Sequence, residues 1–188
     1  MRFYLIDRII EYKSEQMIRA IKNLSISEDF LDDHFPRFPV MPGVLMLEGA
    51  AQLSGPLLRF SLRKRTNIEK HGGVDKGGDC DRKAILMMID RAKFRGLVRP
   101  GDQIIYTAEI LALREDRGKT KVKGEVNGKA VMGAEISFMM VENDNPSLNK
   151  EVIRALDLWT RGGDKNLRKE LFLPEETFAE DLSTEDSL

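Results

Sequence analysis

The sequence predicts an α+β domain in which an antiparallel sheet wraps around one buried helix. Three observations lead to this prediction. Strand-like segments lie on both sides of residues 43–55, a stretch that lacks strand alternation and is rich in Leu, Met and Ala. An Asn-Gly pair, the strongest short hairpin signal, separates the last two strand-like segments.

The N-terminal residues predict a strand, a helical turn and a rigid connection. Residues 2–12 form a mixed apolar segment, a short strand or a lead-in, and residues 15–26 alternate as a strand does. Ser27 precedes several acids, which is a helix-start signal and predicts a short helical turn over 27–35. The next segment contains three prolines that preclude regular structure between residues 35 and 42: Pro36, Pro39 and Pro42.

The central helix begins at Gly43. It is apolar almost all round, which predicts that it is buried. Gly55-Pro56 is expected to kink or end it, although residues 57–65 have the composition to carry it onward. Residues 64–83 contain two Gly pairs and many charges, so we expect a flexible loop there.

Four strand-like segments follow the loop. They span residues 84–96, 103–115, 119–126 and 129–142, and we expect them to form an antiparallel meander. A turn over residues 99–102 separates the first two, and Asn127-Gly128 separates the last two.

The composition changes after this point, so we expect a domain over 1–142 and a C-terminal extension over 143–188. Residues 150–163 have the pattern of a short amphipathic helix. Residues 173–188 are acidic without Lys or Arg, which predicts a disordered or interacting tail.

The overall composition excludes several classes of protein. A chain of 188 residues with 41% hydrophobic residues can bury a core, and a net charge of -1 indicates neither a nucleic-acid nor a membrane partner. No apolar run is long enough for a transmembrane segment. With one cysteine the chain can form no internal disulfide, so we expect a cytoplasmic location. One cysteine and two histidines also argue against a zinc site, so we expect no metal.

A histidine and a buried carboxylate are the candidate reagents. The imidazole of His34 can accept a proton near neutral pH. Burial disfavours the charged form of Glu48, so that carboxyl can stay protonated and donate. Elimination of water requires a base that removes a proton next to a carbonyl and an acid that protonates the departing hydroxyl. The free N–H groups at the helix start, at Pro42-Gly43, can stabilise negative charge on the carbonyl oxygen.

Each of these residues also has a purely structural interpretation. A single loop histidine is more often bonded to a neighbouring backbone group, and a single helical glutamate more often belongs to a polar face. Gln52 lies one turn after Glu48 and either holds its carboxyl or satisfies a buried polar group. His71 lies in a polar segment and is expected to be solvated and idle.

Taken together, the residues form a pattern. "HFPxxPxxPGVLxLExxAQ", present here from His34 to Gln52, resembles the β-hydroxyacyl-acyl carrier protein dehydratases of fatty-acid synthesis. The segments 89–104 and 126–140 are similar to the family's strand-turn-strand and final hairpin, and "LIDRIIEY" also fits. The similarity covers roughly residues 1–142 in the same order.

This resemblance implies a hotdog fold, dehydration of (3R)-hydroxyacyl thioesters to trans-2-enoyl thioesters, and a homodimer that in some members forms a hexamer. His34 of one subunit would be the base and Glu48 of the other the acid. Gln52 would support Glu48, and the Gly43 N–H would polarise the thioester carbonyl. The substrate channel would include Phe35, Pro42 and Val44.

The acyl chain would arrive on the phosphopantetheine of acyl carrier protein, with no further cofactor. The family resemblance suggests a basic patch for that acidic carrier, formed by Arg91, Lys93, Arg95 and Arg99, although such a run is more often a solvated strand face. The chain departs from the family at Arg37, where glycine is usual. The alternatives are a hotdog acyl thioesterase and a catalytically weak acyl-carrier-binding relative.

Overall fold

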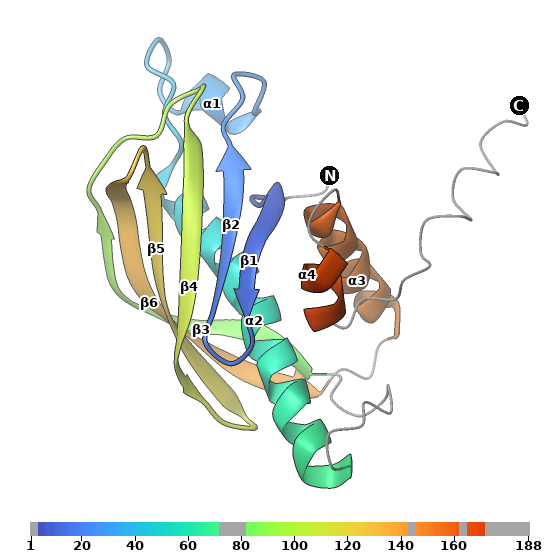
Figure 1. Cartoon of the computed structure of the whole chain (residues 1–188). Coiled ribbons are helices and arrows are strands. Elements are labelled where there is room, and N and C mark those ends of the chain that lie inside the picture. The colour runs from blue at the N-terminus through green and yellow to red at the C-terminus, as the bar shows by residue number, and fades with distance from the viewer. Residues whose placement is uncertain (1–3, 72–81, 143–145, 162–164, 172–188) are drawn as a thin grey trace, which may run out of the picture.

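The fold is a single antiparallel sheet wrapped around one long helix, α2 (Gly43–His71), which confirms the predicted α+β class (Figure 1). The computed structural model describes residues 4–71, 82–142, 146–161 and 165–171. The expected loop residues 72–81 and acidic residues 173–188 lie outside this described part.

The N-terminal elements follow the sequence closely. The strands β1 (Arg8–Lys13) and β2 (Met17–Asn23) pair as an antiparallel hairpin, and the short helix α1 (Phe30–Asp33) falls within the predicted helical turn. Residues 34–42, which contain the three prolines, form no helix or strand.

The helix α2 is longer than predicted. Of the alternatives left open at Gly55-Pro56, the helix does not end there but continues through residues 57–65, and the loop expected over 64–71 is helical up to His71. Proline inside a helix costs about 3 kcal/mol, whereas full burial of a leucine side chain contributes about 1.5–3 kcal/mol. Leu53, Leu57 and Leu58 flank the proline and are fully buried, so their packing outweighs its cost.

The C-terminal four strands do not form the predicted continuous meander. They are β3 (Arg82–Phe94), β4 (Gln103–Leu113), β5 (Arg117–Val126) and β6 (Lys129–Glu142). The order across the sheet is β1-β2-β4-β5-β6-β3, so β3 pairs with β6 at one edge while β4 pairs with β2. Asn127 and Gly128 have φ of 50° and 74°, which is the conformation of the predicted tight hairpin between β5 and β6.

The connection between β3 and β4 explains this difference. The Arg95 N–H donates to the Val131 carbonyl of β6 at 2.7 Å, and the Gly101 N–H donates to the Leu24 carbonyl, just after β2, at 2.8 Å. The connection therefore crosses one end of the sheet and joins its two halves. The "Arg-Pro-Gly-Asp" turn lies at the end of this crossing and does not form a tight hairpin between neighbouring strands.

At Gly49 the backbone of α2 lies close to β4 and to the N-terminal segment. A Cβ at this position would lie 3.0 Å from the Tyr106 hydroxyl and 3.1 Å from the Leu5 carbonyl oxygen. Tyr106 is fully buried on β4, and burial raises the pKa of its hydroxyl well above its ordinary value, so the group stays neutral. Gly49 thus fixes the depth of α2, and with it the position of the adjacent Glu48.

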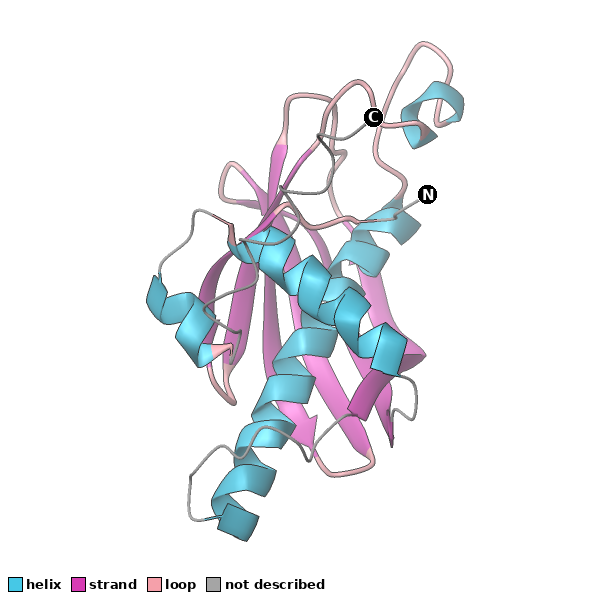
Figure 2. Ribbon diagram, turned by 90° about the vertical axis from the view of Figure 1, so that its right-hand side faces the viewer, coloured by secondary structure: helices cyan, strands magenta, loops and turns pink. Residues whose placement is uncertain are grey.

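Two further helices lie beside β1 (Figure 1), and in the view of Figure 2 one of them crosses in front of the long helix. They are α3 (Pro146–Thr160), which confirms the helix expected over 150–163 but begins four residues earlier and ends three residues sooner, and α4 (Lys165–Glu170). The Arg168 guanidinium donates to the Asp157 carboxylate at 2.6 Å and links the two helices. Leu156 and Trp159 on α3 are buried in the common core. Among the described residues, no helix is both long and apolar enough to cross a membrane.

We expect Gly49→Ala to lower the free energy of unfolding by about 1–3 kcal/mol, the usual cost of overpacking a rigid contact. Chemical denaturation measures this difference. Gly55→Ala is the matched control, because its Cβ would meet only the Ala84 side chain at 3.8 Å. In Gly55→Ala, replacing a helical glycine stabilises the helix by about 0.5–1 kcal/mol. The new Cβ clashes with the ring of the following proline, which opposes this gain. Equal stability of the two variants would contradict the close contact at Gly49.

Candidate functional site

Glu48 and Gln52 lie one turn apart on α2 and form a short hydrogen-bonded chain. The Gln52 side-chain amide donates to Glu48 Oε1 at 3.1 Å, and its own oxygen accepts the Leu5 backbone N–H at 2.9 Å. The contact with the backbone fixes which way the amide points, because only its oxygen can accept from an N–H. Of the two interpretations left open for Gln52, the structure therefore shows the one in which it holds the Glu48 carboxyl.

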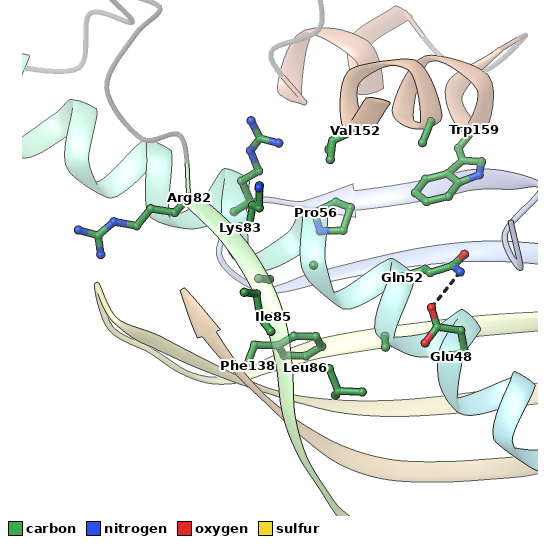
Figure 3. A pocket seen from close by; sticks show the side chains of 15 residues that line it. Glu48, Gln52, Pro56, Arg82, Lys83, Ile85, Leu86, Phe138, Val152 and Trp159 are labelled. Atoms are coloured by element: carbon green, nitrogen blue, oxygen red, sulfur yellow. Dashed lines mark hydrogen bonds between the residues drawn. The ribbon is translucent and has the colours of Figure 1, made fainter. Parts of the chain in front are cut away.

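A pocket of about 370 Å³ opens beside this pair (Figure 3). It lies between α2, the start of β3, β6 and α3. Its middle is mostly apolar, with Pro56, Leu86, Phe138 and Trp159 among the lining side chains. Glu48 and Gln52 lie at one end, whereas the basic residues Arg59, Arg82 and Lys83 also line the pocket farther along. A half-buried carboxyl therefore faces a space suited to an apolar chain.

His34 lies just after α1, and its ring is oriented by the backbone. Its Nδ1 is 2.9 Å from the Val40 carbonyl oxygen, and its ring stacks on Phe35 with centroids 4.2 Å apart. A carbonyl only accepts hydrogen bonds, so Nδ1 carries the proton and Nε2 of the neutral ring is left as a proton acceptor. Such a backbone contact is what a purely structural histidine would make. It also leaves the ring in the tautomer that a general base needs.

Within one chain the structure does not bring His34 and Glu48 into the same pocket. His34 is absent from the pocket lining, and so are the expected channel residues Phe35, Pro42 and Val44. Phe35 and Val44 are 55% and 67% exposed. His34 and Pro42 are partly exposed, so within one chain all four residues lie outside the pocket and reach solvent.

Gly43 begins α2, as predicted. A Cβ at Gly43 would lie 3.1 Å from the ring of Phe94 at the end of β3, so any larger residue would press on that ring. The first N–H groups of a helix have no partner inside it, and those of Gly43 and Val44 are of this kind. They provide hydrogen-bond donors at the positive end of the helix dipole.

The strand β3 exposes an unusual amount of apolar surface. It is the last strand of the sheet, and its second edge is unpaired within the described chain. Five consecutive side chains, between 40% and 62% exposed, are apolar: Ile85, Leu86, Met87, Met88 and Ile89. Isolated edge strands of this kind pair with another chain unless charges block them.

The four predicted carrier-binding residues are all exposed, but they do not form one flat strand face. Arg91 lies at a bulge of β3 with φ 51° and is 3.5 Å from Glu135. Lys93 is the second-last residue of β3, and Arg95 and Arg99 lie on the crossing connection. The Arg99 guanidinium stacks over Phe38, 4.6 Å from the ring centroid. Arg37, beside Phe38, has φ 70°, a conformation that glycine adopts without strain.

The sequence did not reveal the part of the pocket formed by α3. Val152, Ala155 and Trp159 line it, although they are about a hundred positions from Glu48 in the chain. The amphipathic pattern of this segment predicted only that one face is buried. The described residues contain no group of three or more His, Cys, Asp or Glu arranged to hold a metal ion.

Chemically, this arrangement supplies a carboxyl at the mouth of an apolar pocket and, on an exposed surface, an imidazole with a free Nε2. Neither group alone completes an acid-base pair.

Comparison with known proteins points in the same direction. The family model described as the FabA-like domain matches residues 1–135. A 3-hydroxyacyl-[acyl-carrier-protein] dehydratase FabZ of Listeria welshimeri is 38% identical over 138 residues, which is 73% of this chain and 85% of the relative. The protein of the same description from Bartonella quintana is 40% identical over 141 residues, 74% of this chain and 81% of the relative.

Solved structures agree with the fold. The dehydratase heterocomplex ApeI:P from Xenorhabdus doucetiae gives a TM-score of 0.53 at 12% identity, covering 80% of this chain and 90% of that one. The thioesterase HI1161 from Haemophilus influenzae gives a TM-score of 0.50 at 11% identity, covering 73% and 80%. At such low identity these similarities show the fold alone.

We expect Gln52→Leu to lower the free energy of unfolding by about 1–3 kcal/mol, because the buried Leu5 N–H loses its acceptor. Amide hydrogen exchange should show faster exchange at Leu5. The amide of Asp7, which donates to the Ile21 carbonyl at 2.9 Å, serves as an internal reference. Gln52→Glu is the matched control, since it keeps an oxygen for Leu5 but removes the donor to Glu48. Unchanged Leu5 protection in Gln52→Leu would rule out this hydrogen-bonded chain.

Proposed function

The chain belongs to the FabA-like family, and we propose that it dehydrates (3R)-hydroxyacyl thioesters on acyl carrier protein to trans-2-enoyl thioesters, in fatty-acid or related lipid biosynthesis. The observation that carries the proposal is the Glu48–Gln52 pair at the end of an apolar pocket, in a chain that matches dehydratase relatives along most of their length. As a member of this enzyme family, the chain is a hydro-lyase.

Two groups suffice for the proton transfers. In the proposed reaction, Nε2 of His34 removes a proton from C2 of the acyl chain, and the electrons of that C–H bond form the C2–C3 double bond. The C3–O bond breaks, and the Glu48 carboxyl donates its proton so that the hydroxyl leaves as water. The Val40 carbonyl supports this role for His34, because it holds the Nδ1 proton and stabilises the imidazolium that forms.

Negative charge develops on the thioester carbonyl oxygen during proton removal. The N–H of Gly43 at the start of α2 is the proposed donor to that oxygen, reinforced by the helix dipole. Phe94 packs against Gly43 and would help to exclude water from this position.

We propose that the working unit is a homodimer in which His34 of one chain faces Glu48 of the other. The apolar and unpaired edge of β3 supports this proposal, because a second copy pairing there would cover it and continue the sheet. A hexamer built from three dimers is an open extension of the same proposal.

Acyl carrier protein is the proposed partner, and its phosphopantetheine would carry the substrate, so the reaction needs no cofactor of its own. The exposed Arg91, Lys93, Arg95 and Arg99 are suited to an acidic carrier. The exposed Arg37 lies next to Phe38, over which Arg99 stacks, and it adds a further positive charge at this surface. A cytoplasmic location is part of the proposal and is supported by the single cysteine. The net charge of -1 favours no nucleic-acid partner.

The thioesterase and the weak carrier-binding alternatives make different predictions from dehydration. Hydrolysis releases a free thiol, and simple binding produces no product. Dehydration produces the ultraviolet absorbance of a conjugated enoyl thioester. Incubating the protein with a 3-hydroxyacyl thioester while following this absorbance and free thiol separates all three.

We expect His34→Ala and Glu48→Gln each to lower kcat by about 10²–10⁴-fold, because each removes one proton-transfer group. The absorbance assay measures the rates, and circular dichroism checks that the fold survives. Glu109→Gln, an exposed acid on β4, is the matched control and should keep the wild-type rate. A near wild-type rate in either active-site variant would refute its assigned role.

We expect activity to return when the two inactive variants are combined. In a heterodimer of His34→Ala with Glu48→Gln chains, one site lacks both groups and the other has an intact pair. Differently tagged chains, co-expressed and purified as heterodimers, should therefore recover about half of the wild-type rate per dimer if the sites act independently. Heterodimers as inactive as the parent variants would show that each site takes both residues from one chain.

A further inference from the structure

The pocket beside Glu48 has one wall that lies outside the family domain. The matched family model ends at residue 135, whereas α3 begins at Pro146. Val152, Ala155 and Trp159 of this helix line the pocket opposite α2. Any effect of this wall on the substrate is therefore specific to this chain's own extension.

The lining residues occur in a definite order along the pocket (Figure 3). Glu48 lies at one end and is followed along α2 by Gln52 and Pro56. On the opposite side, Trp159 faces the level of Gln52, and Val152 faces the level of Pro56. A chain that extends from Glu48 into the pocket would therefore meet Trp159 first and Val152 later.

The far end of the pocket changes character. Arg59, Arg82 and Lys83 line it there, and the Arg82 guanidinium lies 3.5 Å from Glu142. Pushing an apolar chain end against charged groups removes water from them without giving them a new partner, which is unfavourable. The favourable length for an apolar occupant therefore ends near Pro56 and Val152.

Trp159 is held in this wall mainly by packing. It is 5% exposed and meets Tyr4 edge to face, with ring centroids 5.9 Å apart. Its indole N–H makes no hydrogen bond with any residue that the structure describes. The ring is also the only tryptophan in the sequence, so its fluorescence reports on this pocket alone.

From this geometry, and resting on the proposed function, we propose that α3 sets the acyl-chain length of the substrate. The acyl chain of the 3-hydroxyacyl thioester passes between Gln52 and Trp159, and its tail lies against Pro56 and Val152. The substrate class is then 3-hydroxyacyl thioesters of limited length. Chains that extend past Val152 reach the basic end and lose the benefit of further methylenes.

Binding to the wild-type protein gives the first test. A series of saturated acyl-pantetheines from acetyl to hexadecanoyl, which lack the 3-hydroxyl and cannot be dehydrated, is titrated while tryptophan emission is recorded. We expect the shortest acyl groups to leave the emission unchanged and longer ones to shift it, because only these reach Trp159. Binding of the longer acyl groups, measured by calorimetry, without any change in emission would overturn the proposal.

Substitutions at Val152 give the second test. Val152→Phe fills the pocket beyond Trp159, so kcat/KM for long substrates should fall by about four-fold for each methylene excluded, the factor equivalent to about 0.8 kcal/mol per buried CH₂. Short substrates should keep their rates. Val152→Ala should shift the preference toward longer chains. Leu158→Phe makes a comparable enlargement at an exposed position of α3 that does not line the pocket, and it should leave the preference unchanged.

The outcomes separate this inference from the function on which it rests. If the wild-type protein dehydrates no 3-hydroxyacyl thioester of any length, the proposed function fails. If it does so but Val152→Phe and Leu158→Phe give the same chain-length profile as wild type, only the role of α3 is overturned. A uniform loss of rate at all lengths in Val152→Phe, with the melting temperature unchanged, would also overturn it.

Discussion

The depth at which α2 lies in the curved sheet is the constraint on which the rest of the structure depends. At Gly49 the helix backbone approaches the hydroxyl of Tyr106 and the carbonyl of Leu5 so closely that a Cβ would lie only 3.0 and 3.1 Å from them. Burial of Leu53, Leu57 and Leu58 then holds the helix along its length, even through Pro56. Because Glu48 is adjacent to Gly49, the same contact also fixes the position of its carboxyl, the proposed acid. The N-terminal segment is joined to it through the Leu5 N–H and Gln52.

The candidate site contains two groups, the Glu48 carboxyl and the His34 ring, and different parts of the chain fix their positions. Glu48 depends on helix geometry and on Gln52, whereas His34 depends on the turn that brings Val40 back to its ring. No contact within one chain joins the two groups in the pocket. The proposed reaction needs both groups, so its geometry would come from assembly of two chains, and the edge of β3 would then matter to catalysis as much as the two residues themselves.

The strand β3 departs from the usual pattern, in which apolar side chains are buried. Its apolar residues are exposed in the single chain, which is unfavourable for an isolated monomer and typical of a surface that another chain covers. The helices α3 and α4 pack on β1, and α3 forms a wall of the pocket between α2 and the start of β3. The two regions meet at Ile85 and Leu86, which belong to the exposed part of β3 and also line the pocket.

The sequence by itself determined the features that depend on local chemistry. The prolines exclude regular structure before α2, Gly43 begins the helix, and Asn127-Gly128 forms the predicted tight turn before β6. The spacing of Glu48 and Gln52 placed them on one helix face, where they meet. The motif also identified His34 and Glu48 as candidates, although their roles rest on the family resemblance and not on any contact between them.

Only the tertiary structure decided the features that depend on distant partners. The packing of leucines on the sheet carries α2 past Pro56 to His71, where local propensity predicted a break and a loop. The crossing connection places β3 beside β6 and not beside β4, because hydrogen bonds to Val131 and Leu24 determine its path. Likewise, the amphipathic pattern of α3 indicated a buried face but not what that face would meet. A periodic pattern records which side chains avoid water, whereas the identity of their neighbours depends on how separate segments share one core.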